Sequence, residues 1–151
     1  MEKSIDMFGD ICEAIGLSDI DADTYSPLTL AYIGDAVYEV VIRTMVVDMA
    51  NMQVNKLHKK SSSLVKAKTQ ARIIRLLEDE LDEKEMSVFK RGRNAKSFTK
   101  AKNVSVTDYR IATGFEALVG YLYLAHRTDR MLQLIKTGLD RMENEKCDMK
   151  N

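Results

Sequence analysis

The residues best suited to chemistry are two carboxylates that stand alone on apolar helical segments. At about 100° per residue, residues 28–47 form a helix that is apolar nearly all round. Its three charges, Asp35, Glu39 and Arg43, follow one stripe at i, i+4 and i+8. Glu39 can pair with Arg43 one turn further on, whereas Asp35 has no local partner of this kind.

Glu116 is a sharper case of the same anomaly, because it is the single charge in residues 111–125. The positions three and four residues away on a helix hold alanine, threonine, valine and glycine, and none of them can neutralise a carboxylate. An isolated carboxylate taken out of water costs several kcal/mol, so it must find a cation, shift its pKa or reach a wet cleft.

Two unpaired carboxylates on two central helices are typical of a shared metal site. Oxygen ligation by carboxylates and water suits Mg²⁺, and Mn²⁺ is a plausible substitute. The alternative is that each carboxylate meets an arginine from another helix or sits on an exposed stripe, and the charge pattern alone leaves both interpretations open. Gly34 and Gly120, next to these carboxylates in helix interiors, indicate close backbone approach or simply tight packing.

Residues 90–102, called the basic segment below, carry six basic side chains and no acidic one. Lysine, arginine and asparagine supply the phosphate and 2′-hydroxyl contacts by which duplex RNA is recognised. Gly92 and Asn94 within the segment predict a turn or loop. A solvated charged face is the simpler explanation of the charges alone. His58, Lys59 and Lys60, with Lys66 and Lys68, either extend the basic surface or are ordinary surface residues.

The segments that carry the two carboxylates and the basic side chains are all predicted to be helices, so the predicted fold class is all-α. An amphipathic helix over residues 5–15 stops at Gly16, and Ser26-Pro27 starts a long helix that runs to about residue 48. Residues 53–81 predict a short and a longer helix with a break near residues 61–63. Ser105 starts a helix to about residue 127, and a last helix covers residues 129–142.

Chain length, charge and cysteine content limit the possible functions but do not identify one. A chain of 151 residues fits one domain, and 23 basic and 23 acidic residues cancel, so any nucleic-acid binding must come from a local surface. The two cysteines show no metal-binding spacing, and no apolar run is long enough to span a bilayer. We therefore expect a reduced, cytoplasmic protein. His126 is expected to be structural, and the tyrosines Tyr32, Tyr38, Tyr121 and Tyr123 are expected to be packing residues with polar tips.

Residues 30–39, Leu-Ala-Tyr-Ile-Gly-Asp-Ala-Val-Tyr-Glu, resemble the signature helix of the ribonuclease III catalytic domain, and residues 115–120, Phe-Glu-Ala-Leu-Val-Gly, resemble its second metal-binding helix. Residues 91–96 and 109–116 look like the Mini-ribonuclease III subgroup, which consists of the catalytic domain alone. The resemblance spans about residues 25–139. It implies a single homodimeric domain of residues 1–151 without a separate double-stranded-RNA-binding domain.

The resemblance further implies a Mg²⁺-dependent endonuclease that cuts double-stranded RNA and leaves a 5′-phosphate and a 3′-hydroxyl. Asp35 and Glu116 fall on the family's catalytic metal ligands. The expected substrate is the large-subunit (23S) ribosomal RNA precursor, and whether a ribosomal protein must shape it stays open. The expected RNA contacts come from the basic segment: Arg91, Arg93, Asn94, Lys96, Lys100 and Lys102.

Two departures from the larger family members bear on the site. They carry a glutamate and an aspartate where this chain has Ala31 and Thr113, so we expect a lean site completed by water and RNA phosphates, with weak metal binding in the absence of RNA. The alternative function is a catalytically silent RNA-binding or ribosome-associated module that kept the fold. Retention of both Asp35 and Glu116 argues against that alternative.

Overall fold

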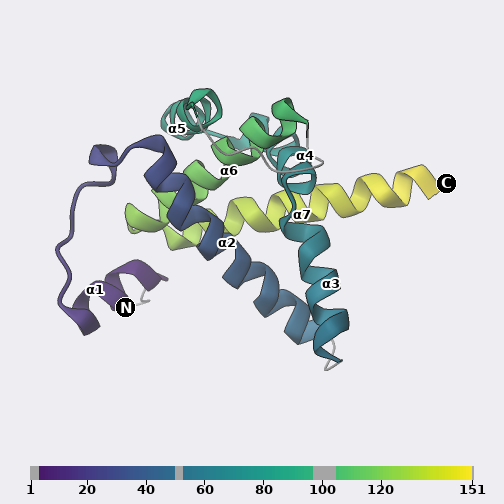
Figure 1. The fold of residues 1–151 in the computed structure, drawn as a ribbon, viewed down its shortest axis with the longest axis horizontal. Coiled ribbons are helices and arrows are strands. Elements are labelled where there is room, and N and C mark those ends of the chain that lie inside the picture. The colour runs from purple at the N-terminus through teal and green to yellow at the C-terminus, as the bar shows by residue number, and fades with distance from the viewer. Residues whose placement is uncertain (1–3, 50–52, 97–104, 151) are drawn as a thin grey trace.

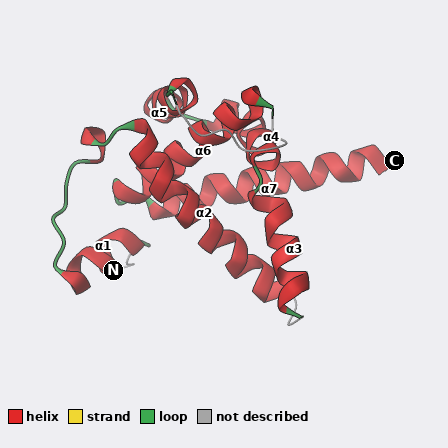
Figure 2. Cartoon of the chain, viewed as in Figure 1, coloured by secondary structure: helices red, strands yellow, loops and turns green. Residues whose placement is uncertain are grey.

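The computed structural model describes residues 4–49, 53–96 and 105–150, and within these ranges it contains helices and no strand (Figure 2). The predicted all-α class is confirmed. The α-helices are α1 (Met7–Ile15), α2 (Pro27–Met49), α3 (Val54–Val65), α4 (Ala67–Leu77), α5 (Glu83–Asn94), α6 (Val106–Leu124) and α7 (Thr128–Lys150). Two short 3-10 turns, Ala22–Thr24 and Glu78–Glu80, complete the order. None of the described helices is long and apolar enough to cross a membrane.

Helix α6 is the centre of the fold, and α2, α4 and α5 pack around it (Figure 1). Its composition explains this position, because residues 111–125 offer apolar side chains to every direction. Phe115, Leu118 and Leu122 are each 1% exposed. Ser105 caps its start by accepting a hydrogen bond from the Asp108 amide at 3.0 Å, as the sequence predicts. Helix α7 lies against α4 and extends to the C-terminal end.

The predicted break near residues 61–63 is wrong, because α3 continues through these serines. The Ser61 and Ser63 hydroxyls donate to the carbonyls of His58 and Lys60, so they are satisfied within the helix. The chain breaks at Lys66, whose backbone is extended with φ −65° and ψ 152°. Helices α3 and α4 therefore meet at one residue, and the last helix also runs past the predicted end at residue 142, to Lys150.

Helix α5 is not among the predicted helices, although the sequence carries its start signal. The Asp82 side chain accepts a hydrogen bond from the Glu85 amide at 2.8 Å, and the Glu85 side chain accepts one from the Asp82 amide at 3.0 Å. This is a capping box. Glu85 is 1% exposed and pairs with the Arg130 guanidinium through two 2.9 Å hydrogen bonds, which tie α5 to α7.

Candidate active site

Helix α2, which carries Asp35, begins where the sequence predicts. Pro27 is its first residue, and the Ser26 hydroxyl accepts a hydrogen bond from the Thr29 amide at 3.3 Å. Tyr38 and Ile42 are fully buried and hold the helix against the core. Tyr38 also packs edge-on against Phe115 of α6 at 5.3 Å between ring centroids. These contacts fix α2 on α6 along the turns that carry the two carboxylates.

The helices α2 and α6 meet backbone to backbone at two glycines. A Cβ on Gly34 would lie 1.8 Å from the Glu116 carbonyl oxygen, and a Cβ on Gly120 would lie 1.9 Å from the Leu30 carbonyl oxygen. No side chain larger than hydrogen fits either position without a shift of a helix. Asp35 follows Gly34 directly, so this crossing brings it beside the turn of Glu116.

The crossing leaves Glu116 partly buried and Asp35 on its exposed side. Burial, and then the charge of Asp35, raise the pKa of Glu116 to about 8. Burial, and then the charge of Glu39, raise the pKa of Asp35. Within the described residues neither carboxylate has an ion-pair partner, so neither is neutralised by an arginine from another helix. The other alternative, an exposed position, holds for Asp35 but not for Glu116. Glu39 pairs with Arg43 at 2.6 Å, as predicted.

This donor set suits a hard cation better than a thiophilic one, because it offers only carboxylate oxygens. Across the described ranges no three His, Cys, Asp or Glu side chains gather as a metal site, so the two carboxylates would leave further coordination positions to other ligands. A cation that retains water ligands fits this shortage. A bound cation would also relieve the repulsion and burial that raise the pKa of Glu116.

Helix α5 places part of the basic segment beside the same turns of α6. A Cβ on Gly92 would lie 2.7 Å from the Ala117 Cβ and 3.3 Å from the Thr113 carbonyl oxygen. The predicted turn or loop around Gly92 and Asn94 is wrong, since both residues lie in the last turns of α5. Gly92 instead permits close packing of α5 on α6.

The predicted RNA-binding residues separate into groups. Arg91 and Asn94 are exposed and line one shallow groove with Lys90. Arg93 is partly buried, with its guanidinium 5.7 Å from the Phe89 ring centroid and its Nε donating to the Asn94 Oδ1. Lys96 is exposed just beyond α5. Lys100 and Lys102 lie outside the described residues.

His126 and the tyrosines noted in the sequence differ in their surroundings. The backbone of His126 is left-handed, with φ 61°. Its ring nitrogens form hydrogen bonds with Asp6 at 2.8 Å and Asp19 at 2.9 Å, which agrees with a structural role. Tyr38 and Tyr123 are buried as predicted, but Tyr32 is 81% exposed, because it lies on the side of α2 away from α6.

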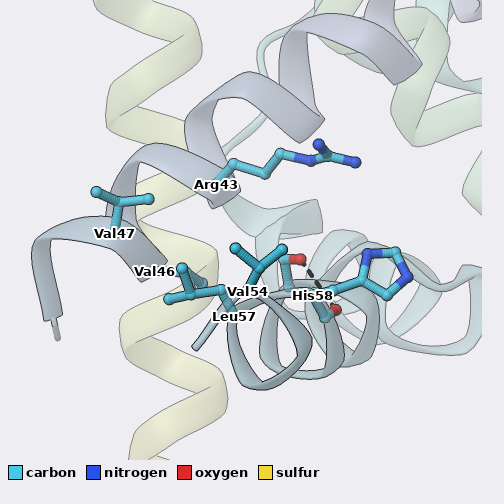
Figure 3. Close-up of a pocket in the computed structure, with 7 residues that line it drawn as sticks. Arg43, Val46, Val47, Val54, Leu57 and His58 are labelled. Atoms are coloured by element: carbon cyan, nitrogen blue, oxygen red, sulfur yellow. Dashed lines mark hydrogen bonds between the residues drawn. The ribbon is translucent and has the colours of Figure 1, made fainter. Parts of the chain in front are cut away.

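A cavity between the ends of α2 and α3 is lined by Val46, Val47, Val54 and Leu57, with Arg43 and His58 also on it (Figure 3). Its walls are mainly apolar. It includes neither Asp35 nor Glu116, so it is separate from the candidate active site.

Residues 28–127 match the Ribonuclease III domain family. A Mini-ribonuclease 3 from Clostridium tetani is 50% identical over 124 residues, which cover 82% of this chain and 82% of that protein. The chain belongs to the Mini-ribonuclease 3 group of the ribonuclease III family. The matched range contains both Asp35 and Glu116, and it also contains Gly34 and Gly120, which let their helices approach closely.

Further relatives agree with membership of the ribonuclease III family. A Mini-ribonuclease 3 from Thermoanaerobacter sp. strain X514 is 46% identical over 143 residues, covering 95% of this chain and 99% of that protein. A crystal structure of a Fusobacterium nucleatum protein superposes with a TM-score of 0.70 at 31% identity, covering 76% of this chain and 88% of that chain. The protein is accordingly an endoribonuclease of the ribonuclease III type, a family that acts on double-stranded RNA and generally depends on divalent metals.

Proposed function

We propose that this endoribonuclease hydrolyses duplex RNA at a Mg²⁺ site held by Asp35 and Glu116, with Mn²⁺ as a substitute. The observation that carries the proposal is the pair itself: a partly buried glutamate with a pKa raised to about 8 beside an aspartate, with no cationic side chain on either within the described residues. The metal, when bound, would activate water and stabilise charge on the scissile phosphate. The products would carry a 5′-phosphate and a 3′-hydroxyl.

The residues of this chain would orient the reacting groups rather than transfer protons through a histidine. Glu116 is held by the rigid crossing at Gly34, so its carboxylate is positioned before substrate arrives. The RNA phosphates would be bound by Arg91, Arg93 and Asn94 in the last turns of α5, by Lys96 just beyond that helix, and by Lys100 and Lys102. The substrate proposed from the family resemblance is the 23S ribosomal RNA precursor, with a ribosomal protein as an additional partner on the RNA, in the cytoplasm.

The catalytic roles are tested by incubating a long RNA duplex and Mg²⁺ with Asp35→Asn and Glu116→Gln. Each variant should lose cleavage by about a hundred-fold or more, because even groups that only support a metal ligand are worth 10–100-fold. Glu39→Gln is the matched control, since Glu39 lies on the same stripe but already pairs with Arg43. Robust cleavage by either test variant would overturn the assignment of the ligands. Absence of cleavage by the unmodified protein on several duplexes would instead favour the silent RNA-binding module.

Metal binding to the free protein should be weak. Two carboxylates leave most coordination positions to water and, in the complex, to RNA phosphates. Calorimetric titration of Mg²⁺ into the unmodified protein should show clear saturation only when a duplex with non-hydrolysable linkages is bound. Saturation of the free protein at low micromolar Mg²⁺ would contradict this view of the site.

We propose that the active form is a homodimer. Support comes from the face of α2 that turns away from α6, where Tyr32 is 81%, Val40 53% and Val47 62% exposed. Exposed large apolar side chains favour an interface, and on this side of α2 the Glu39–Arg43 ion pair lies among them. Sedimentation equilibrium should give the dimer mass, and Tyr32→Glu should shift the protein toward the monomer. A monomeric unmodified protein that cleaves at the full rate would refute the homodimer.

A further inference from the structure

The lysines of α3 and the α3–α4 junction form a second basic region, far along the chain from the basic segment. Residues 53–77 contain seven basic side chains and no acidic one. Arg72 and Arg75 pair with Glu145 and Asp108. The five lysines of this range have no ion-pair partner within the described residues: Lys56, Lys59, Lys60, Lys66 and Lys68. Their charge is therefore available to an anionic ligand.

A cavity of about 240 Å³ lies where α3, α4 and the C-terminal part of α7 meet. Four basic side chains line it, Lys66, Lys68, Arg72 and Lys146, and no carboxylate does. Glu145 neutralises Arg72 at 2.7 Å, so three lysines remain to define the charge of the cavity. Met142 and Leu64 form its apolar wall.

The backbone at this junction presents donors rather than acceptors. The carbonyls that end α3 are already used: the Thr69 hydroxyl donates to Ser63, the Tyr38 hydroxyl to Leu64 and the Gln70 amide to Val65. The negative end of the α3 dipole is thus covered by side-chain donors. No acceptor side chain from the described residues takes the same role at the start of α4. The Thr69 and Gln70 amides donate to the Lys66 carbonyl, so the Ala67 and Lys68 amides are the ones without an acceptor among the described residues.

Gln70 is buried at the same junction and does not line the cavity. Its side chain is 2% exposed, and its Nε2 donates to the Val65 carbonyl at 2.7 Å. Its Oε1 is buried and has no hydrogen-bond partner in the part of the chain that the structure describes.

The exposed side of α3 leads into this cavity. Lys56, Lys59, Lys60 and Ser63 fall within about 100° of one another on the helix, and Ser63 lines the cavity. The opposite side of α3 holds Leu57, Ser61 and Leu64, which pack toward the core. A polyanion lying along α3 would therefore meet the lysines in succession and end at the cavity.

We propose that the α3–α4–α7 cavity binds a phosphate group, held by Lys66, Lys68, Lys146 and the first amides of α4. The donors match a phosphate in charge and geometry, because helix starts and lysines are both suited to tetrahedral anions. The phosphate comes either from the backbone of the RNA substrate or from a small phosphorylated molecule. The RNA source rests on the proposed function, whereas the phosphate site itself does not.

The first test uses inorganic phosphate as the probe. Phosphate titrated into the ¹⁵N-labelled protein should move the amide signals of Ala67 and Lys68, and sodium chloride at the same ionic strength should not. Lys68→Glu should abolish these shifts. Lys136→Glu is the matched control, because it makes the same charge change on an exposed lysine of α7 that pairs only with Asp140 in the described residues. Identical shifts with chloride, or shifts that survive Lys68→Glu, would overturn the site.

The second test distinguishes the sources with duplex RNA in EDTA, where no cleavage occurs. If the phosphate belongs to RNA, Lys68→Glu should weaken binding and lower the salt slope by about 0.9 for each phosphate that the protein no longer neutralises, while Lys136→Glu leaves the slope unchanged. If RNA binding is unchanged but the phosphate shifts are present, the source is a small phosphorylated molecule. Neither measurement depends on Asp35 or Glu116, so failure of the metal-site assignment would leave this result intact.

Discussion

Gly34→Ala should lower both stability and catalytic rate, because it adds a side chain where α2 and α6 cross. The new Cβ would sit 1.8 Å from the Glu116 carbonyl oxygen and 2.8 Å from the Gly120 amide nitrogen. Both atoms belong to the backbone of a central helix and have no rotamer to change. Normal carbon–oxygen contacts lie well above ~3 Å, so one helix must move by more than about 1 Å.

The expected magnitudes follow from this displacement. Overpacking lowers the free energy of unfolding by about 1–3 kcal/mol, and the backbone contact places Gly34→Ala at the upper end. Replacing a helical glycine by alanine raises it by about 1 kcal/mol. The net loss of about 2 kcal/mol corresponds to a fall in melting temperature of roughly 4–8 °C for a chain of this size. A shift of about 1 Å between the Asp35 and Glu116 turns should lower kcat by about a hundred-fold.

Thermal melting followed by circular dichroism and cleavage of a duplex RNA below the melting temperature measure the two effects. Gly138→Ala is the matched control, since its Cβ would meet the buried Ile73 and Leu77 side chains instead of backbone and lies away from the carboxylates. It should change stability modestly and leave kcat unaltered. A Gly34→Ala protein with unchanged melting and unchanged cleavage would refute the crossing as the device that positions the site.

Three further predictions concern structural partners. Glu85→Gln, by leaving the guanidinium of Arg130 without its buried carboxylate, should lower the free energy of unfolding by about 3 kcal/mol in urea denaturation; a change below about 1 kcal/mol would contradict the pairing. Tyr38→Phe leaves the Leu64 carbonyl of α3 without its donor. It should lower the free energy of unfolding by about 1–2 kcal/mol and leave metal binding, measured by calorimetry, unchanged. Hydrogen bonds to Asp19 and Asp6 raise the pKa of His126, so its anchoring of α1 is complete below pH 6.5 and is lost as pH rises through the raised pKa. Hydrogen exchange of α1 amides should accelerate over that window in the unmodified protein and show no such step in His126→Gln.

The order of amino acids was enough to identify the two carboxylates, the long helix that starts at Ser26-Pro27 and the cap at Ser105. Each of these depends on neighbours within one or two turns, and such short-range interactions can be inferred from the order of residues. The unpaired state of Asp35 on its own helix was visible for the same reason. The start signal of α5 was also local, with Asp82 and Glu85 three residues apart, but it was hidden in an acidic run.

The partner that each residue meets on another helix depends on how the helices pack, which the sequence did not reveal. The tertiary structure placed Gly34 on the Glu116 carbonyl and Gly92 on Ala117, joined His126 to Asp6 and Asp19, and exposed Tyr32, which the apolar pattern had predicted to pack. It also brought Lys146 of α7 to the lysines of the α3–α4 junction. These contacts join residues that are tens of positions apart, and helical periodicity gives the face of a residue but not the helix that covers that face.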